Sequence, residues 1–166
     1  MDIIKRIAKG ENKALEELFL LYKEKVFRMA LAILGDRFLS EDVVQETFLK
    51  FYYSEKHFST EQHLKAWLIV TASNYCKDLL KQAFRKQKNL EDFREIAGEE
   101  EQHTDEIMEI VMNLPEKYKT SVYLYYYEGY NSREIAKLLH KPESTIRTYL
   151  QKARKILKQE IGEKKE

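Results

Sequence analysis

Apolar residues recur at intervals of three and four along the first half of the chain, which is the period of a helix packed on one face. The pattern predicts a helix over 13–34 that ends at Gly35-Asp36. A second helix is expected to begin at Ser40, a good N-cap followed by two carboxylates. A third is expected over roughly 61–85. The residues predicted to face inward are Leu15, Leu18, Tyr22, Val26, Met29 and Ile33, then Val44, Phe48 and Phe51, then Leu64, Leu68, Ala72, Tyr75 and Leu79.

Residues 131–158 have the pattern of a short helix, a tight turn and a longer helix. Asn131 can cap the first of these helices, and Glu134 can reach back to it as in a capping box. Pro142 cannot continue a helix but suits the first turn of a new one, so the chain is expected to bend there. The arrangement predicts a helix-turn-helix, a motif that reads duplex DNA. Its predicted buried residues are Ile135, Leu138 and Leu139, then Ile146, Leu150, Ala153 and Leu157.

The outward side of the longer helix is basic. Residues 143–159 hold five cations against one anion, for a net charge of +4. Such a helix fits a major groove, with its first two turns at base edges and its cations at phosphates. The predicted outward residues are Arg147, Thr148, Gln151, Lys152, Lys155 and Lys158. The alternative is a solvated basic face at the end of a helical bundle, which the helix-turn-helix arrangement disfavours.

An aromatic loop, YYSEKHFSTEQ, lies between the second and third predicted helices. Aromatic rings beside basic helices can hold single-stranded DNA, because an unstacked base that stacks on a ring gains roughly 1–3 kcal/mol. The alternative, favoured for each residue taken alone, is that Tyr52, Tyr53, Phe58 and Trp67 belong to the core.

Composition argues against an enzyme. The four histidines are scattered, and the sequence has no HExxH, CxxC or P-loop motif, so no catalytic residue, metal site or cofactor is predicted. Asp42 and Glu46 share a helix face and are interpreted as a binding surface. The single cysteine, Cys76, cannot form an internal disulfide and is interpreted as structural. No signal peptide or membrane span is apparent, so we expect a cytoplasmic protein.

The net charge of +1 is the sum of three consecutive segments with different net charges. Residues 1–90 carry +4, residues 91–109 carry −8 and residues 110–166 carry +5. With only five glycines and two prolines in 166 residues, this pattern predicts an all-α chain of two small helical domains joined by an acidic flexible linker. The expected boundaries are 1–88, 89–104 and 105–166.

Three segments taken together resemble the extracytoplasmic-function (group IV) sigma factors of bacterial RNA polymerase. They are LSEDVVQETFLKFY (39–52), HLKAWLIVTASNYCKDLLK (63–81) and the run from NLPEKYKTS through the helix-turn-helix. The match covers about 10–160 in the family's order and spacing, including its acidic linker. The resemblance implies that the first domain is sigma region 2 and the second is sigma region 4.

The resemblance also implies which residues carry each function. Region 2 would dock on the clamp helices of the polymerase through Asp42, Gln45, Glu46 and Leu49. It would capture a flipped base of the minus-ten element through Phe58, Ser59, Thr60, Asn74, Asp78 and Lys81. Region 4 would pack on the flap tip and read the minus-thirty-five duplex through Arg147, Thr148, Tyr149, Gln151, Lys152 and Lys155. The chain departs from common family residues at Ser59-Thr60, Val70 and Tyr149, which alters the expected promoter sequence.

The expected partners are therefore core RNA polymerase, promoter DNA in duplex and single-stranded form, and an anti-sigma factor, commonly membrane-anchored in this family. No small-molecule substrate is expected. Three other interpretations of the sequence stay open at this point. They are a stand-alone helix-turn-helix regulator, a small nuclease or recombinase, and a purely structural helical bundle.

Overall fold

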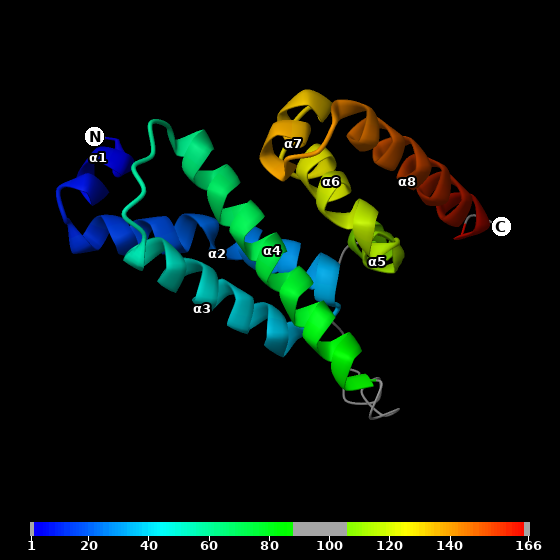
Figure 1. The fold of residues 1–166 in the computed structure, drawn as a ribbon, viewed down its shortest axis with the longest axis horizontal. Coiled ribbons are helices and arrows are strands. Elements are labelled where there is room, and N and C mark those ends of the chain that lie inside the picture. The colour runs from blue at the N-terminus through cyan, green and yellow to red at the C-terminus, as the bar shows by residue number, and fades with distance from the viewer. Residues whose placement is uncertain (1, 88–105, 165–166) are drawn as a thin grey trace.

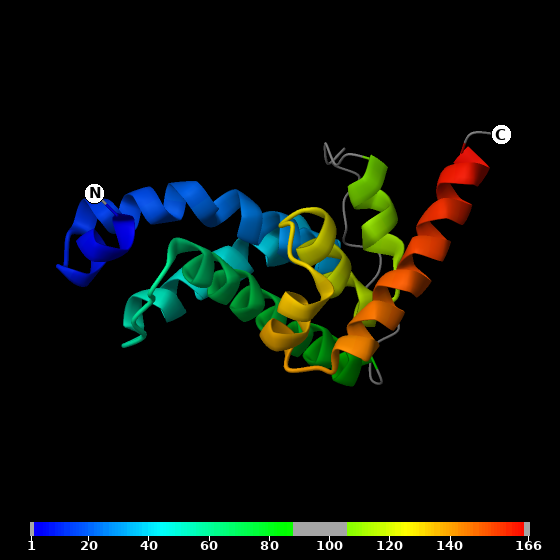
Figure 2. The ribbon, with the colours of Figure 1, turned by 90° about the horizontal axis from the view of Figure 1, so that it is seen from above.

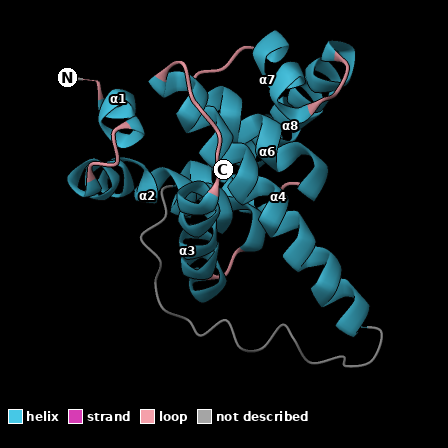
Figure 3. Cartoon of the chain, turned by 60° about the vertical axis from the view of Figure 1, so that its left-hand side comes forward, coloured by secondary structure: helices cyan, strands magenta, loops and turns pink. Residues whose placement is uncertain are grey.

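The computed structural model describes residues 2–87 and 106–164, and every regular element in those ranges is a helix (Figure 3). An N-terminal domain contains α1 (Ile3–Ala8), α2 (Asn12–Leu34), α3 (Arg37–Tyr53) and α4 (Glu61–Gln87). A C-terminal domain contains α5 (Glu106–Asn113), α6 (Glu116–Tyr126), α7 (Ser132–Leu139) and α8 (Glu143–Lys164). The two helical domains predicted from the sequence are confirmed, while the expected linker, 89–104, lies outside the described residues.

In the N-terminal domain, α2, α3 and α4 pack against one another around one apolar interior (Figure 1). The predicted stripe of α2 is buried from Leu18 to Ile33, because its members fall on one side of the helix. Leu64, Leu68 and Ala72 of α4 are buried as predicted, whereas Tyr75 and Leu79 are half-buried. The hydroxyl of Tyr22 donates to Glu61 at 2.7 Å and fixes α2 against the start of α4.

The prediction that Ser40 caps α3 is wrong. The helix begins one turn earlier, and its N-cap is Asp36, whose carboxylate accepts from the backbone N–H of Leu39 at 2.9 Å. Gly35 ends α2 in the left-handed conformation with φ of 63°, which lets the chain reverse directly into this cap. Ser40 is instead buried inside α3, where its hydroxyl donates to the backbone oxygen of Asp36 at 2.6 Å.

The C-terminal domain is built around α6, whose residues from Tyr118 to Leu124 are all buried. Both α5 and α8 pack against it, and α7 packs against α6 and α8. Ile135 of α7 and Ile146, Leu150 and Ala153 of α8 are buried as predicted. Leu138, Leu139 and Leu157 are half-buried.

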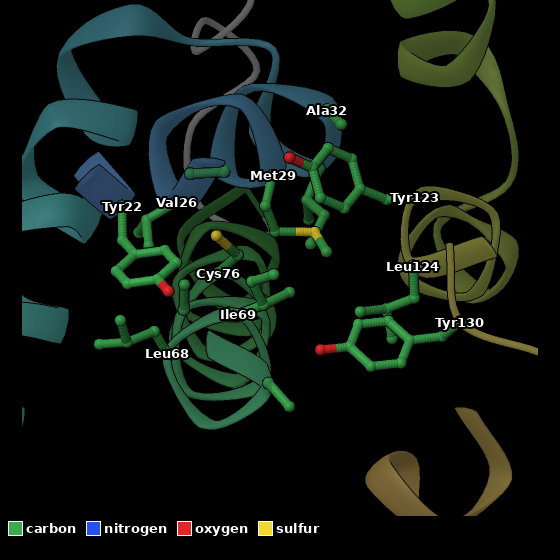
Figure 4. Close-up of a cluster of buried hydrophobic side chains, with 14 of the residues drawn as sticks. Tyr22, Val26, Met29, Ala32, Leu68, Ile69, Cys76, Tyr123, Leu124 and Tyr130 are labelled. Carbon is green, nitrogen blue, oxygen red and sulfur yellow. The ribbon is translucent and has the colours of Figure 1, made fainter. Parts of the chain in front are cut away.

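The two domains share one continuous core. Met29 of α2 and Ile69 of α4 belong to the same cluster of buried side chains as Tyr123 and Leu124 of α6 (Figure 4). Seen from above, α6 and the turn into α7 lie over α2 and α4 (Figure 2). In this arrangement each domain covers part of the other.

Cys76 is fully buried in α4, and burial raises the pKa of its thiol to about 12. At pH 8 its thiolate is then a fraction on the order of 10⁻⁴, against about a quarter for an ordinary thiol. We expect the folded protein to react with a thiol reagent at least a hundredfold more slowly than the denatured protein, as measured by absorbance of the released thiolate. Equal rates would contradict the burial of Cys76.

Among the described residues, no helix is both long and apolar enough to cross a membrane.

Candidate nucleic-acid interface

The first helix of the predicted helix-turn-helix is held by the predicted capping box. The carboxamide oxygen of Asn131 accepts from the N–H of Glu134 at 2.9 Å, and the N–H of Asn131 donates to the Glu134 carboxylate at 2.9 Å. Two backbone donors at the helix start are satisfied in this way, so α7 has a defined first turn.

The turn between the two helices is set by His140 and Pro142. His140 ends α7 in the left-handed conformation with φ of 53°, and the N–H of Lys141 donates to the oxygen of Ala136 at 3.0 Å. The backbone oxygen of Pro142 then accepts from Thr145 at 3.0 Å, which begins α8. The chain bends and the new helix begins where the sequence predicted. α8 then extends from the turn as a long helix, distinct from α7 (Figure 1).

The basic outward face of α8 is present. Its predicted members Arg147, Thr148, Gln151, Lys152, Lys155 and Lys158 are all exposed. Arg147 donates to the Glu143 carboxylate at 2.8 Å, and Ser132 of α7 donates to the same oxygen at 3.2 Å. Glu143 thus links the two helices of the motif and holds the Arg147 guanidinium at the N-terminal end of α8.

Tyr149 lies apart from this face. Its ring is half-buried and packs on Tyr118 of α6, with 5.3 Å between the ring centres. It also lines a groove of about 1200 Å³, whose other walls are the C-terminal half of α4, the turn from α2 into α3 and the start of α6. Its assignment to base reading stays a prediction, and its position links the recognition helix to the domain core.

Phe58, in the loop before α4, belongs to an aromatic cluster. Its ring centre lies 5.8 Å from Phe51, 5.7 Å from Trp67 and 5.4 Å from His63. Phe58 is half-buried, so one part of the ring supports the core while another part remains accessible. Phe58 can therefore pack in the core and also offer part of its ring to an unpaired base.

The residues around Phe58 differ in what they can do. Ser59 is exposed, while the hydroxyl of Thr60 accepts from the N–H of His63 at 3.1 Å at the start of α4. The Lys56 ammonium lies 5.6 Å from the centre of the Trp67 ring, which places a cation beside the aromatic cluster.

Asn74, Asp78 and Lys81 are exposed along α4. Asn74 is seven residues, or two turns, after Trp67, so the three side chains continue the side of α4 on which the aromatic cluster begins. The structure thereby brings the predicted minus-ten residues onto one surface of the N-terminal domain.

The predicted docking residues lie on the outward side of α3. Asp42, Gln45 and Leu49 are exposed, and Glu46 is half-buried. Next to them, an apolar pocket of about 430 Å³ opens between α2 and α3, and Gln45 and Leu49 line it.

Sequence reasoning missed the other walls of this pocket, chiefly Phe19 of α2 and Tyr52 of α3. Phe19 packs edge-on against Phe48, with 4.9 Å between their ring centres. The available signal was the run Phe19-Leu20-Leu21, whose members stand outside the buried stripe of α2 and remain exposed.

The aromatic residues at the C-terminal end of α6 are divided between the core and the surface. Tyr123 is fully buried, and its ring stacks on Tyr127 with 5.0 Å between centres. Tyr125 and Tyr126 are exposed and contact each other edge-on. Among the described residues, no group of histidine, cysteine and acidic side chains is placed to hold a metal ion.

Comparison with known proteins accounts for both domains. Residues 18–88 match the family described as Sigma-70 region 2, and residues 104–157 match the family described as Sigma-70, region 4. An ECF RNA polymerase sigma-E factor of Haemophilus influenzae is 30% identical, in an alignment that covers 96% of this chain and 93% of that protein. The chain belongs to the ECF sigma factors. It is thus an alternative sigma factor, a class of protein that directs transcription initiation.

Other ECF sigma factors are similar over most of their length. The sigma factor SigW of Bacillus subtilis is 24% identical, covering 95% of this chain and 94% of that protein. A solved structure of the sigma factor RpoE from Bartonella quintana, in complex with the anti-sigma factor NepR, superposes with a TM-score of 0.72. It covers 89% of this chain and 96% of its own, at 19% identity, and therefore supports the fold of both domains.

Proposed function

We propose that this ECF sigma factor binds core RNA polymerase, opens the minus-ten element with its N-terminal domain and reads the minus-thirty-five element with its C-terminal domain. The observation that carries the proposal is the pairing of two different surfaces in one chain. One is a basic recognition helix, suited to duplex DNA, and the other is an aromatic cluster continued by polar residues, suited to unpaired bases.

For polymerase docking, the proposed surface is the outward side of α3 together with the adjoining pocket. Asp42 and Glu46 supply negative charge, while Leu49 and Phe19 supply apolar area. An interface with an apolar centre and a charged rim is the usual composition of a specific protein contact. The proposed receptor is the clamp helices of the polymerase, with the flap tip contacting the C-terminal domain.

For promoter opening, the N-terminal domain exchanges paired, stacked bases for bases held by protein. A flipped base costs a few kcal/mol to extrude, and stacking on an aromatic ring returns roughly 1–3 kcal/mol. Phe58 supplies the ring, and Asn74 supplies donors and acceptors for a base edge. Lys56, beside the aromatic cluster, and Lys81 are the proposed cations for phosphates of the separated strand. No step requires a catalytic residue or a cofactor.

For duplex recognition, α8 enters the major groove with Arg147, Gln151 and Lys152 toward the bases. Each well-formed bidentate contact gives about 1–3 kcal/mol of discrimination between bases. Lys155 meets the backbone, and Thr148 and Tyr149 complete the proposed recognition set. Contact with phosphates fixes register and makes the affinity depend on salt.

We expect Lys152→Ala to reduce transcription from cognate promoters about tenfold, because a base or phosphate contact in the recognition helix is lost. Binding to core polymerase should be unchanged. Run-off transcription and a polymerase pull-down measure the two effects. Lys13→Ala, at another exposed lysine on α2, is the matched control. Unaltered transcription by the Lys152 variant would remove α8 from promoter recognition.

We expect Asn74→Ala to leave closed-complex formation intact and to slow promoter opening several-fold, because a base-edge contact is removed without changing the core. Permanganate reactivity of unpaired thymines measures the opening rate. Gln82→Ala, exposed on the same helix, serves as its control. Opening at the wild-type rate would show that Asn74 does not touch the flipped base.

We propose that an anti-sigma factor, possessing its own membrane anchor, holds this protein inactive in the cytoplasm. The Bartonella sigma factor bound to NepR supports this class of partner. Co-purification from cells with and without membrane extraction tests it.

A further inference from the structure

With its two domains packed together, the protein is too short to reach both promoter elements. The two elements are centred about 25 base pairs apart, which at 3.4 Å per pair is a span on the order of 85 Å. The longest helix, α4, has 27 residues and so extends only about 40 Å. A compact chain of 166 residues has a radius of gyration of roughly 15 Å. Both elements can be bound at once only if the two domains separate.

Separation must break a specific set of contacts. The hydroxyls of Ser73 and Thr120 share a buried hydrogen bond of 2.9 Å. The Lys119 ammonium, itself buried, donates to the backbone oxygen of Ile33 at 3.3 Å. The hydroxyl of Tyr123 donates to the backbone oxygen of Lys25 at 3.0 Å. Each contact joins one domain to the other, so together they fix one relative placement.

Glu128, just after α6, is the charged centre of this interface. Its side chain is 2% exposed, and one carboxylate oxygen lies 3.2 Å from the Lys65 ammonium and 3.5 Å from that of Lys25. These lysines come from α4 and α2, whereas Glu128 comes from the C-terminal domain. A buried carboxylate without a counter-charge is costly, so the closed placement depends on both lysines.

The same interface leaves the DNA-binding surfaces uncovered. Lys65, Ile69 and Ser73 repeat every fourth residue along the side of α4 that faces the C-terminal domain. Asn74 is exposed on another side, and Lys81 is also exposed, although it lines the groove of about 1200 Å³ between the domains. The outward residues of α8 are exposed as well. The closed arrangement therefore limits how far the two surfaces can reach and does not mask either one.

We propose that Glu128, held between Lys25 and Lys65, is an interdomain latch that keeps the free sigma factor closed and unable to span a promoter until core polymerase separates the domains. The inference rests on the proposed division of promoter elements between the domains. A closed state populated in excess lowers the apparent affinity for any partner that needs the open state, by the fraction that is open. Weakening the latch should then strengthen binding, the opposite of what ordinary structural damage does.

The charge of Glu128 can be removed without changing its shape. In Glu128→Gln the lysines keep access to water, since the side chain of Lys25 is 40% exposed and that of Lys65 is 22% exposed. Lys65→Met removes one counter-charge and keeps the apolar stem. Glu163→Gln, exposed near the end of α8, is the matched control.

The first test measures the distance between domains in the free full-length chain. Spin labels at Tyr53→Cys and Lys137→Cys, both exposed sites, are used in a Cys76→Ala background. The wild-type background should give one narrow, short distance, and Glu128→Gln should add a broad, longer population. A wild-type distribution that is already broad and long would overturn the latch.

The second test titrates core polymerase with each variant in run-off transcription. Glu128→Gln and Lys65→Met should reach half-maximal transcription at a concentration at least threefold lower than wild type, with the same maximum at saturation. Unchanged or raised midpoints in both variants would overturn the latch while leaving the proposed function intact. If the wild-type protein gives no transcription at saturation, the proposed function fails instead, and the distance measurement alone then decides whether the latch exists.

Discussion

Leu49→Glu is expected to reduce the affinity for core RNA polymerase at least tenfold. Leu49 is 50% exposed on α3 and lines the apolar pocket beside Gln45, so it is available to a partner without holding the fold together. Burying a leucine in an interface contributes about 1.5–3 kcal/mol, and each 1.4 kcal/mol corresponds to a factor of ten in affinity. A carboxylate at this position would also have to be desolvated, which adds to the loss.

Affinity can be measured by fluorescence anisotropy of the labelled protein titrated with core polymerase. Leu20→Glu provides the control, because Leu20 is even more exposed but lies on α2 outside the pocket. We expect the two variants to have equal melting temperatures and to differ in polymerase binding. Equal binding by both would place the docking surface elsewhere.

Phe51→Ala is expected to destabilise the protein by about 3–5 kcal/mol and to abolish promoter opening. Phe51 is buried at the end of α3, where its ring lies 5.8 Å from Phe58 and 6.0 Å from Trp67. Removing it leaves a cavity under the loop that presents Phe58. The substitution should therefore lower the stability of the fold and displace the Phe58 ring that is proposed to stack on a base.

The stability change can be followed by chemical denaturation monitored by circular dichroism. Tyr53→Ala, two residues later but 76% exposed, should change the free energy of unfolding by less than about 0.5 kcal/mol. Promoter opening should be tested below the melting temperature of the variant. Normal promoter opening by folded Phe51→Ala protein would show that Phe58 acts without support from Phe51. It would contradict the proposal that the core cluster holds the Phe58 ring in place for a base.

Local patterns in the sequence predicted most of what lies within each domain. The Asn131 and Glu134 capping box, the turn at Pro142 and the exposed basic face of α8 follow from short-range spacing, which sequence displays directly. The start of α3 was mispredicted because Asp36 and Ser40 are both good N-caps one turn apart. Only the reversal at Gly35 decides between them, and it favours Asp36.

The relation between the domains could not be predicted. Lys25 and Lys65 are 40 residues apart along the chain, and Lys65 and Glu128 are 63 residues apart. In the sequence, each of the three looks like an ordinary charged residue on the surface. Only the fold places both ammonium groups within 4 Å of the Glu128 carboxylate. Tyr149 is a different case, because only the family resemblance assigned it to base reading. It lies three residues after Ile146, next to the buried stripe of α8, and it packs on Tyr118.

The central claim is that two helical domains of one chain hold a duplex element and an opened element while bound to polymerase. Its most direct measurement is run-off transcription with purified core RNA polymerase, with and without this protein, on a library of bacterial genomic fragments with mapped start sites. We expect new start sites that appear only with the protein and share two elements about 25 base pairs apart. Transcription that is the same with and without the protein across the whole library would contradict it.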